Sequence, residues 1–231
     1  MIILDQIHKT FKGHKALDNL CLKVESGEIY GLLGANGAGK STTLNLVLGF
    51  LEADSGSIQL VDVSNDSSIE RNEIGYIPEN VHLYPYLSGR ENLDYFSKLA
   101  GMTYTPAELS AFLTKCGLEE TAHDKRTSEY SKGMRQKVGI AIAYAKNAKV
   151  YLLDEPASGL DPLASNELSD LLKTLASNGA AILMASHDIF RVRETCNRIG
   201  ILKQGKLVKE IDSSAVTSSE LESIYLNFMK D

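Results

Sequence analysis

The sequence predicts an α/β fold built on a parallel sheet, with an N-terminal antiparallel β-subdomain and an inserted α-helical subdomain. Two observations carry this prediction. Strand-like apolar runs alternate with helix-like segments at both ends of the 231-residue chain, which is typical of parallel sheets. Between them, apolar residues recur at three- and four-residue spacing over about residues 80–145. We therefore expect a single domain, 1–231, with 1–79 and 146–231 forming the core and β-subdomain and 80–145 the helical subdomain.

The N-terminal part of the chain reads as strands separated by turns. Strands are expected over Met1–Leu4, Leu17–Val24 and Glu28–Leu33, with a turn at Ser26-Gly27 before the last of them. A further strand is expected over Ser57–Val61.

Helices and strands alternate in the remainder of the chain. Helix assignments depend on the spacing of apolar residues, and strand assignments on short apolar runs bounded by turn residues. The expected elements are helices over Asn92–Leu99, Pro106–Cys116 and Lys132–Ala145, a strand over Val150–Leu153, a helix over Leu163–Ala176, a strand over Ala180–Ala185, a short helix after Asp188, a hairpin of Ile199–Leu202 and Lys206–Ile211, and a helix over about Ser218–Met229.

A glycine-rich loop between a predicted strand and a predicted helix is the most informative motif. Residues 34–41 follow the pattern Gly, four residues, Gly-Lys-Ser, which is that of a P-loop NTPase core. In such a loop backbone N–H groups surround a polyphosphate, the lysine reaches the β- and γ-phosphates, and the serine hydroxyl holds Mg²⁺. A nucleoside triphosphate is therefore expected to bind Gly34, Ala35, Asn36, Gly37, Ala38, Gly39, Lys40, Ser41 and Thr42.

Two carboxylates end the apolar strand at Val150–Leu153. Such a strand, buried on both faces, brings Asp154 to its carboxyl end beside the phosphate loop, where it can hold Mg²⁺. Glu155 comes one residue later and would act on the attacking water as a base or orienting group. The plainer alternative is a core strand that ends in a helix-capping acid.

Bulk properties narrow the class of protein. The formal net charge of −6 argues against nucleic acid as a partner, since nucleic-acid binders usually present a basic face. No uncharged run is long enough to span a membrane, and the first residues lack the pattern of a signal peptide. Three scattered cysteines without metal-ligand spacing indicate reduced thiols in a cytoplasmic protein.

Three further motifs occur in a characteristic order. The stretch from Tyr130 to Gln136 (Tyr-Ser-Lys-Gly-Met-Arg-Gln) precedes the Asp154 strand, residues 158–161 (Ser-Gly-Leu-Asp) follow it, and residues 186–188 (Ser-His-Asp) follow the next strand. In this order and spacing the chain resembles the ATP-binding-cassette (ABC) ATPases, specifically the nucleotide-binding subunit of a transporter. The resemblance extends over essentially the whole chain.

The resemblance implies roles for individual residues. It implies adenine stacking on Phe11, catalytic roles for Lys40, Glu155 and His187, and ATP and Mg²⁺ as cofactors. His187 would contact the γ-phosphate and the attacking water. The residues that would act across a dimer are Ser131, Lys132, Gly133 and Gln136, which contact ATP bound to the opposite subunit, and Asp161 at the dimer interface.

The chain departs from the common family pattern in two segments. The signature more often reads Leu-Ser-Gly-Gly-Gln, whereas Tyr130, Lys132 and Met134 replace three of its five residues here; this wording resembles the exporter branch. The segment that usually ends in Gln ends here in Glu79. Because hard cations prefer carboxylate oxygen, Glu79 is expected to be a ligand of Mg²⁺ together with Ser41 and Asp154.

The implied function is an ATPase subunit that powers transport, with export favoured by the resemblance. Its expected partners are a second copy of itself, or a related ATPase subunit, and an integral membrane permease, so it would lie on the inner face of the cell membrane. The segment from Glu79 to Tyr86 is the expected permease contact, unless its aromatics pack inside the helical subdomain. Alternative functions are a cassette ATPase in DNA repair, chromosome architecture or translation, and a module that binds ATP as a switch without hydrolysing it.

Overall fold

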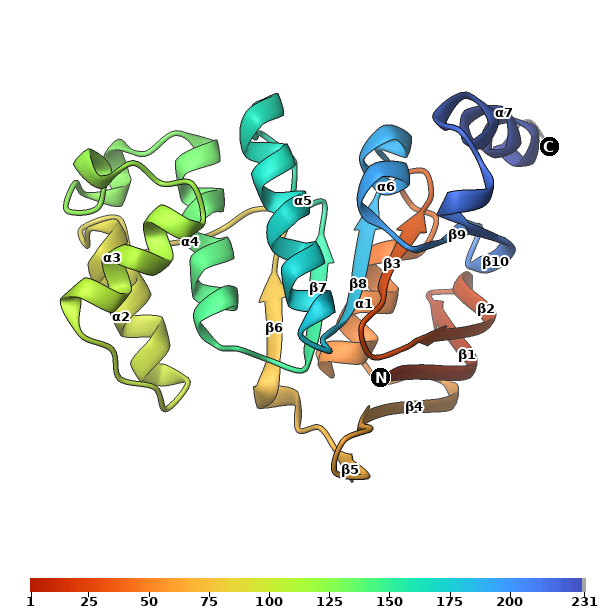
Figure 1. Ribbon diagram of the computed structural model, residues 1–231. Coiled ribbons are helices and arrows are strands. Elements are labelled where there is room, and N and C mark those ends of the chain that lie inside the picture. Colours follow the sequence, from red (N-terminus) through yellow and green to blue (C-terminus); the bar gives the residue numbers. More distant parts are fainter. Residues whose placement is uncertain (230–231) are drawn as a thin grey trace.

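Two β-sheets organise the chain in the computed structural model, which describes residues 1–229 (Figure 1). The larger sheet has six strands in the order β10-β9-β3-β8-β7-β6. Its neighbours pair in parallel except for β9 and β10, which form an antiparallel hairpin at one edge. In that order the strands are Lys206–Asp212, Arg198–Lys203, Ile29–Leu33, Ala181–Ser186, Val150–Asp154 and Ile74–Ile77.

Helices cover both faces of the six-stranded sheet (Figure 1). Alternate residues of β3 show why: Ile29 and Leu33 belong to the apolar core under α5 and α6, whereas Tyr30 and Leu32 belong to the core under α1. Strands buried on both faces have no polar alternation, which explains the continuous apolar runs of the sequence. The three helices span Lys40–Leu48 (α1), Pro162–Ser177 (α5) and Ile189–Thr195 (α6).

The second sheet contains the N-terminal strands, paired antiparallel in the order β2-β1-β4-β5. They span His14–Val24 (β2), Ile2–Phe11 (β1), Ser55–Asp62 (β4) and Ser67–Ser68 (β5). The first strand is longer than the predicted Met1–Leu4, because it continues to a tight turn in which Lys12 and Gly13 both have positive φ. This extension carries Phe11 to the pocket that residues of the phosphate loop also line.

Three helices form a separate group beside strand β6 (Figure 1). They span Gly89–Leu99 (α2), Pro106–Lys115 (α3) and Lys132–Ala145 (α4). Capping explains where each begins: the Ser88 and Thr105 side chains form capping boxes, and the Ser131 hydroxyl accepts from the Met134 N–H.

The last helix, α7 (Ser218–Met229), packs against α6, and the Lys203 Nζ donates to the Phe228 carbonyl at its end at 2.7 Å. Short 3₁₀ turns complete the fold at Arg71–Glu73, Glu120–Ala122, Thr127–Glu129 and Ser213–Ala215. The predicted α/β fold class is confirmed, although strand β6 was not among the expected elements. No helix within residues 1–229 combines the length and apolar character needed to cross a bilayer.

Candidate functional site

The phosphate loop connects β3 to α1 and is held between the N-terminal hairpin and the β9–β10 hairpin. Gly39 has a φ of 112°, and a Cβ there would lie 2.7 Å from the Ala16 carbonyl oxygen. A Cβ on Gly34 would lie 2.7 Å from the Leu202 carbonyl oxygen. Both positions therefore require glycine, since a side chain would push the loop away from the elements that shape it.

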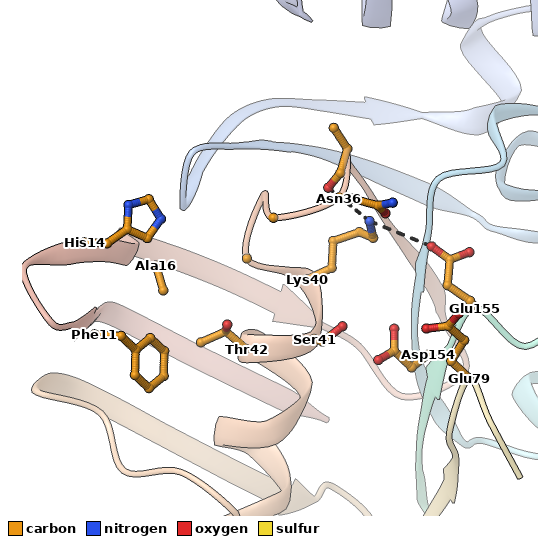
Figure 2. Close-up of a pocket in the computed structure, with 13 residues that line it drawn as sticks. Phe11, His14, Ala16, Asn36, Lys40, Ser41, Thr42, Glu79, Asp154 and Glu155 are labelled. Carbon is orange, nitrogen blue, oxygen red and sulfur yellow. Dashed lines mark hydrogen bonds and ion pairs between the residues drawn. The ribbon is translucent and has the colours of Figure 1, made fainter.

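Lys40 lies in the interior of this loop. Its side chain is only 6% exposed, and its Nζ donates to the carbonyl oxygens of Gly34 at 2.7 Å and Ala35 at 3.2 Å. The same Nζ is 3.8 Å from Oε1 of Glu155 (Figure 2). The ammonium group is thus directed into the loop, where it can exchange carbonyl partners for phosphate oxygens.

Carboxylates converge beside the start of α1. Asp154 ends β7, and burial raises the pKa of its carboxyl. The neighbouring Ser41 hydroxyl lowers this pKa, as does the Lys40 charge, whereas the negative charges of Glu155 and Glu79 raise it further. A cation at this point would relieve the repulsion among the three carboxylates.

The protein side chains do not complete a metal site by themselves. Within the part of the chain that the structure describes, no group of three or more His, Cys, Asp or Glu side chains is arranged to hold a metal ion. Mg²⁺ usually takes one or two protein ligands and completes its shell with water and substrate phosphate oxygens. The Ser41 hydroxyl and the Asp154 carboxylate fit that requirement, with Glu79 lining the same pocket.

Glu155 is held in an unusual backbone conformation. Its φ of +46° lies in the left-handed region, which for a non-glycine residue costs on the order of 1–3 kcal/mol. Two backbone hydrogen bonds maintain it: its N–H donates to Ala185 at 2.9 Å, and its carbonyl accepts from Ser158 at 3.0 Å. Its Oε1 lies 2.7 Å from Nδ1 of His187. The structure therefore brings Glu155, His187 and Lys40 together.

Lys40 and Glu155 lie at one end of a pocket with a volume of about 350 Å³, whereas His187 is not among the residues that line it (Figure 2). Phe11 lies at the other end with its side chain 42% exposed, which suits a ring that is to stack on a base rather than pack in a core. His14 and Ala16 also line this end, and the sequence reading missed both. Recognising the hairpin in the sequence would have identified them, because Phe11 pairs with His14 across its turn.

The signature residues lie outside this pocket. Ser131 caps α4, and Gly133 lies in the first turn, where a Cβ would meet the Gly159 carbonyl oxygen at 3.0 Å. Lys132 donates from Nζ to the Ser158 hydroxyl at 2.9 Å. Asp161 caps α5 by accepting from the Ala164 N–H at 2.9 Å, which holds the pKa of its carboxyl below the usual range.

The expectation for Gln136 requires correction. Its side chain is only 1% exposed, and its Nε2 donates to the Pro156 carbonyl at 3.1 Å. Gln136 therefore links α4 to the loop after β7, and its amide has no surface to offer to ATP on another subunit. The helical periodicity directs this side chain inward, and burial then decides its partner.

Comparisons with known proteins agree with one another. The family model described as ABC transporter matches residues 17–158. The chain is 38% identical over 210 residues to the uncharacterized ABC transporter ATP-binding protein YhaQ of Bacillus subtilis, covering 90% of this chain and 70% of that protein. It is 34% identical over 224 residues to the Nod factor export ATP-binding protein I of Paraburkholderia xenovorans, covering 95% and 73% respectively. Among solved structures, the dimeric post-hydrolysis state of the ATP-binding cassette MJ0796, bound to ADP and Pi, matches with a TM-score of 0.82 and 26% identity over 92% of this chain and 99% of that chain.

Proposed function

The chain belongs to the ABC transporter family as an ATP-hydrolysing subunit, and we propose that it powers export through a separate membrane permease by ATP-driven dimerisation. The observation that carries the catalytic part of this proposal is the position of Glu155. Its carboxylate lies beside the phosphate loop, 3.8 Å from the Lys40 ammonium and 2.7 Å from the His187 imidazole. A module that only bound ATP would need neither the carboxylate nor the imidazole.

Each of these groups has a distinct task in hydrolysis. Lys40 would bind the β- and γ-phosphates and offset their negative charge in the ground state and in the transition state. The Glu155 carboxylate orients the attacking water or accepts its proton. The His187 imidazole, held on Glu155, contacts the γ-phosphate and helps to place the water. Phe11 offers a flat apolar surface to the adenine.

Ser41, Asp154 and Glu79 are the residues proposed to hold Mg²⁺. An ion held there would neutralise negative charge on the phosphates. Asp154 suits this role because burial and neighbouring carboxylates disfavour its charge in the absence of a cation.

A second copy of the chain is the proposed partner across the ATP. Ser131 and Gly133 lie at the first turn of α4, where a hydroxyl and free N–H groups can bind phosphate. In one chain they do not line the pocket that contains Lys40. Two chains arranged head to tail would complete two such sites, with Lys132 and Asp161 at the interface. The dimeric state of the solved MJ0796 cassette supports a second copy of the chain as the partner.

The proposed permease contact begins at Tyr84 and Tyr86. Tyr86 is 82% exposed, and Tyr84 packs edge-on against Tyr95 with ring centroids 4.9 Å apart. Tyr84 also stacks on Phe96, which lines a groove of about 830 Å³ between β6, α2 and the end of α4. Phe96 therefore connects Tyr84 to the groove, and we propose that the exposed aromatics and the groove together receive an apolar helix.

The other apolar residues of the segment from Glu79 to Tyr86 are only partly free for this contact. Val81 and Leu83, which share the segment, are half-buried, and Val81 packs against Gly139 of α4. The proposed contact surface is therefore made by the tyrosines and the groove. Residence on the inner face of the membrane would follow from this contact.

Glu155→Gln tests the catalytic assignment. The substitution preserves shape but removes the carboxylate charge, so single-turnover ATP hydrolysis should fall roughly 10²- to 10⁴-fold while ATP binding is retained. The variant should also form a stable dimer with ATP in the absence of Mg²⁺, measured by size-exclusion chromatography. Glu222→Gln, on the exposed side of α7, is the matched control and should behave as wild type. Turnover near the wild-type rate in Glu155→Gln would contradict the role of this carboxylate.

Mixing two inactive variants tests the shared site. Ser131→Arg leaves the phosphate loop intact but blocks the neighbouring site, whereas Lys40→Ala has the opposite defect. Each variant alone should be inactive, and a mixed dimer should regain activity because one complete site forms from the two intact halves. If demonstrated subunit exchange restores no activity, a single shared site is not sufficient for turnover.

A further inference from the structure

Ser186 joins three segments of the candidate site. It ends β8, is 5% exposed, and its carbonyl accepts from the N–H of Gly34, the first glycine of the phosphate loop, at 3.3 Å. Its hydroxyl donates to Oε2 of Glu155 at 3.0 Å and accepts from the N–H of Asp188 at 3.1 Å. This buried hydroxyl therefore donates to Glu155 and accepts from the loop that contains His187.

The two oxygens of the Glu155 carboxylate have separate partners. Oε2 accepts from Ser186, whereas Oε1 is 2.7 Å from Nδ1 of His187 and 3.8 Å from Nζ of Lys40. A glutamate carboxylate rotates almost freely about its last bond unless a neighbour fixes it. The Ser186 hydroxyl is the neighbour that holds Oε2 on the buried side, and it thereby leaves Oε1 directed toward the reacting groups.

The backbone makes this arrangement specific to Ser186. The left-handed conformation of Glu155 and its N–H bond to Ala185 place the carboxylate beside the end of β8. The bond from the Asp188 N–H fixes the hydroxyl from its other side, and Asp188 in turn caps α6 by accepting from the Arg191 N–H at 3.0 Å. The O–H of Ser186 is thus directed toward Glu155, whose carboxylate accepts its hydrogen bond.

We propose that Ser186 is a positioning residue for ATP hydrolysis, which orients the Glu155 carboxylate so that Oε1 acts on the attacking water. It touches neither the nucleotide nor the water and acts through Glu155. The inference rests on the proposed role of Glu155. A purely structural serine would affect folding or nucleotide affinity, whereas a positioning serine affects the rate of the chemical step.

Ser186→Ala removes the donor and leaves the carboxylate free to rotate. Losing one hydrogen bond to an ionised group should lower kcat about 10- to 100-fold, with KM for ATP within about twofold of wild type. Ser186→Thr retains the hydroxyl and should keep kcat within about threefold. Ser186→Cys replaces it with a weak donor and should resemble Ser186→Ala, so it decides the question if the alanine variant does not fold. ATP-dependent dimerisation should persist in all three.

Ser169→Ala is the matched control. Its hydroxyl is also buried and also has two partners, donating to the Ser165 carbonyl at 3.0 Å and lying 2.8 Å from the Thr195 hydroxyl, but it contacts no residue of the site. Wild-type kcat in Ser169→Ala together with a reduced kcat in Ser186→Ala assigns the effect to the site rather than to the loss of a buried hydroxyl.

A double variant separates this inference from the proposed function. Because Ser186 acts through Glu155, adding Ser186→Ala to Glu155→Gln should cause no further loss in single-turnover rate. A further loss, a wild-type kcat in Ser186→Ala, or a rise in KM equal to the fall in kcat would each overturn the positioning role. If Glu155→Gln itself turned over normally, the proposed function of Glu155 would fail instead.

Discussion

Tyr130, which replaces the leucine of the common signature, makes structural contacts that a leucine could not make. The substitution Tyr130→Phe tests the contribution of its hydroxyl. The Tyr130 ring is only 4% exposed, and its hydroxyl donates to the Ala122 carbonyl at 2.5 Å. The ring lies against Gly89, where a Cβ would be 2.5 Å from the phenolic oxygen. Tyr130 therefore ties the start of α4, directly before Ser131, to the turn at Ala122 and to the beginning of α2.

The cost of removing the hydroxyl can be worked out from these contacts. The Ala122 carbonyl also accepts from the Lys125 N–H at 3.0 Å, so it keeps one partner and the loss is that of an ordinary net hydrogen bond, about 1 kcal/mol. Unfolding entropy scales with chain length and amounts to about 0.5 kcal/mol per kelvin for a chain of this size. Tyr130→Phe should therefore lower Tm by about 2 °C, and Tyr130→Leu by about 4 °C or more because it also removes ring contacts.

Differential scanning calorimetry of the wild type and the two variants provides the measurement. Tyr86→Phe is the control, because this ring is 82% exposed and its hydroxyl should contribute nothing measurable. ATPase activity of Tyr130→Phe should stay within about twofold of wild type, since no contact of Ser131 changes. A Tyr130→Phe variant as stable as Tyr86→Phe, or a Tyr130→Leu variant more stable than wild type, would refute the reasoning.

Two further predictions concern the nucleotide and the cation. Lys40→Ala should weaken ATP binding at least about 10-fold, because the cation that offsets the β- and γ-phosphate charge is lost. Equilibrium titration with a fluorescent ATP analogue measures the affinity. Unchanged affinity in a folded variant would contradict the assignment of the phosphate loop. Glu79→Gln should leave ATPase activity within about tenfold at saturating Mg²⁺ but move half-saturation to higher Mg²⁺, because one carboxylate is removed from beside Asp154. Superimposable Mg²⁺ titrations for Glu79→Gln and wild type would instead favour a contact between Glu79 and the permease.

Local signals made much of the fold and site predictable. The phosphate loop is defined by glycine conformation and by a lysine and serine at fixed spacing, so residues 34–41 identify it without tertiary information. A strand that is buried on both faces appears in the sequence as a continuous apolar run, and an amphipathic helix appears as apolar residues at three- and four-residue spacing. For this reason β7 and α4 were predicted close to their observed bounds. Strand β6 has only four residues at the edge of the sheet and carries too little pattern to be recognised.

Contacts between segments distant in sequence were decided only by the tertiary structure. Ser186 and Glu155 are 31 residues apart and meet because β7 and β8 pair in parallel and bring their carboxyl ends to the same edge of the sheet. Gln136 was expected to face a second subunit, but the packing of α4 buries its amide against Pro156. The sequence by itself determined which chemical groups the chain has and which short segments can present them. Which group contacts which atom depends on the pairing of strands and the packing of helices, because those interactions join residues that no local pattern relates.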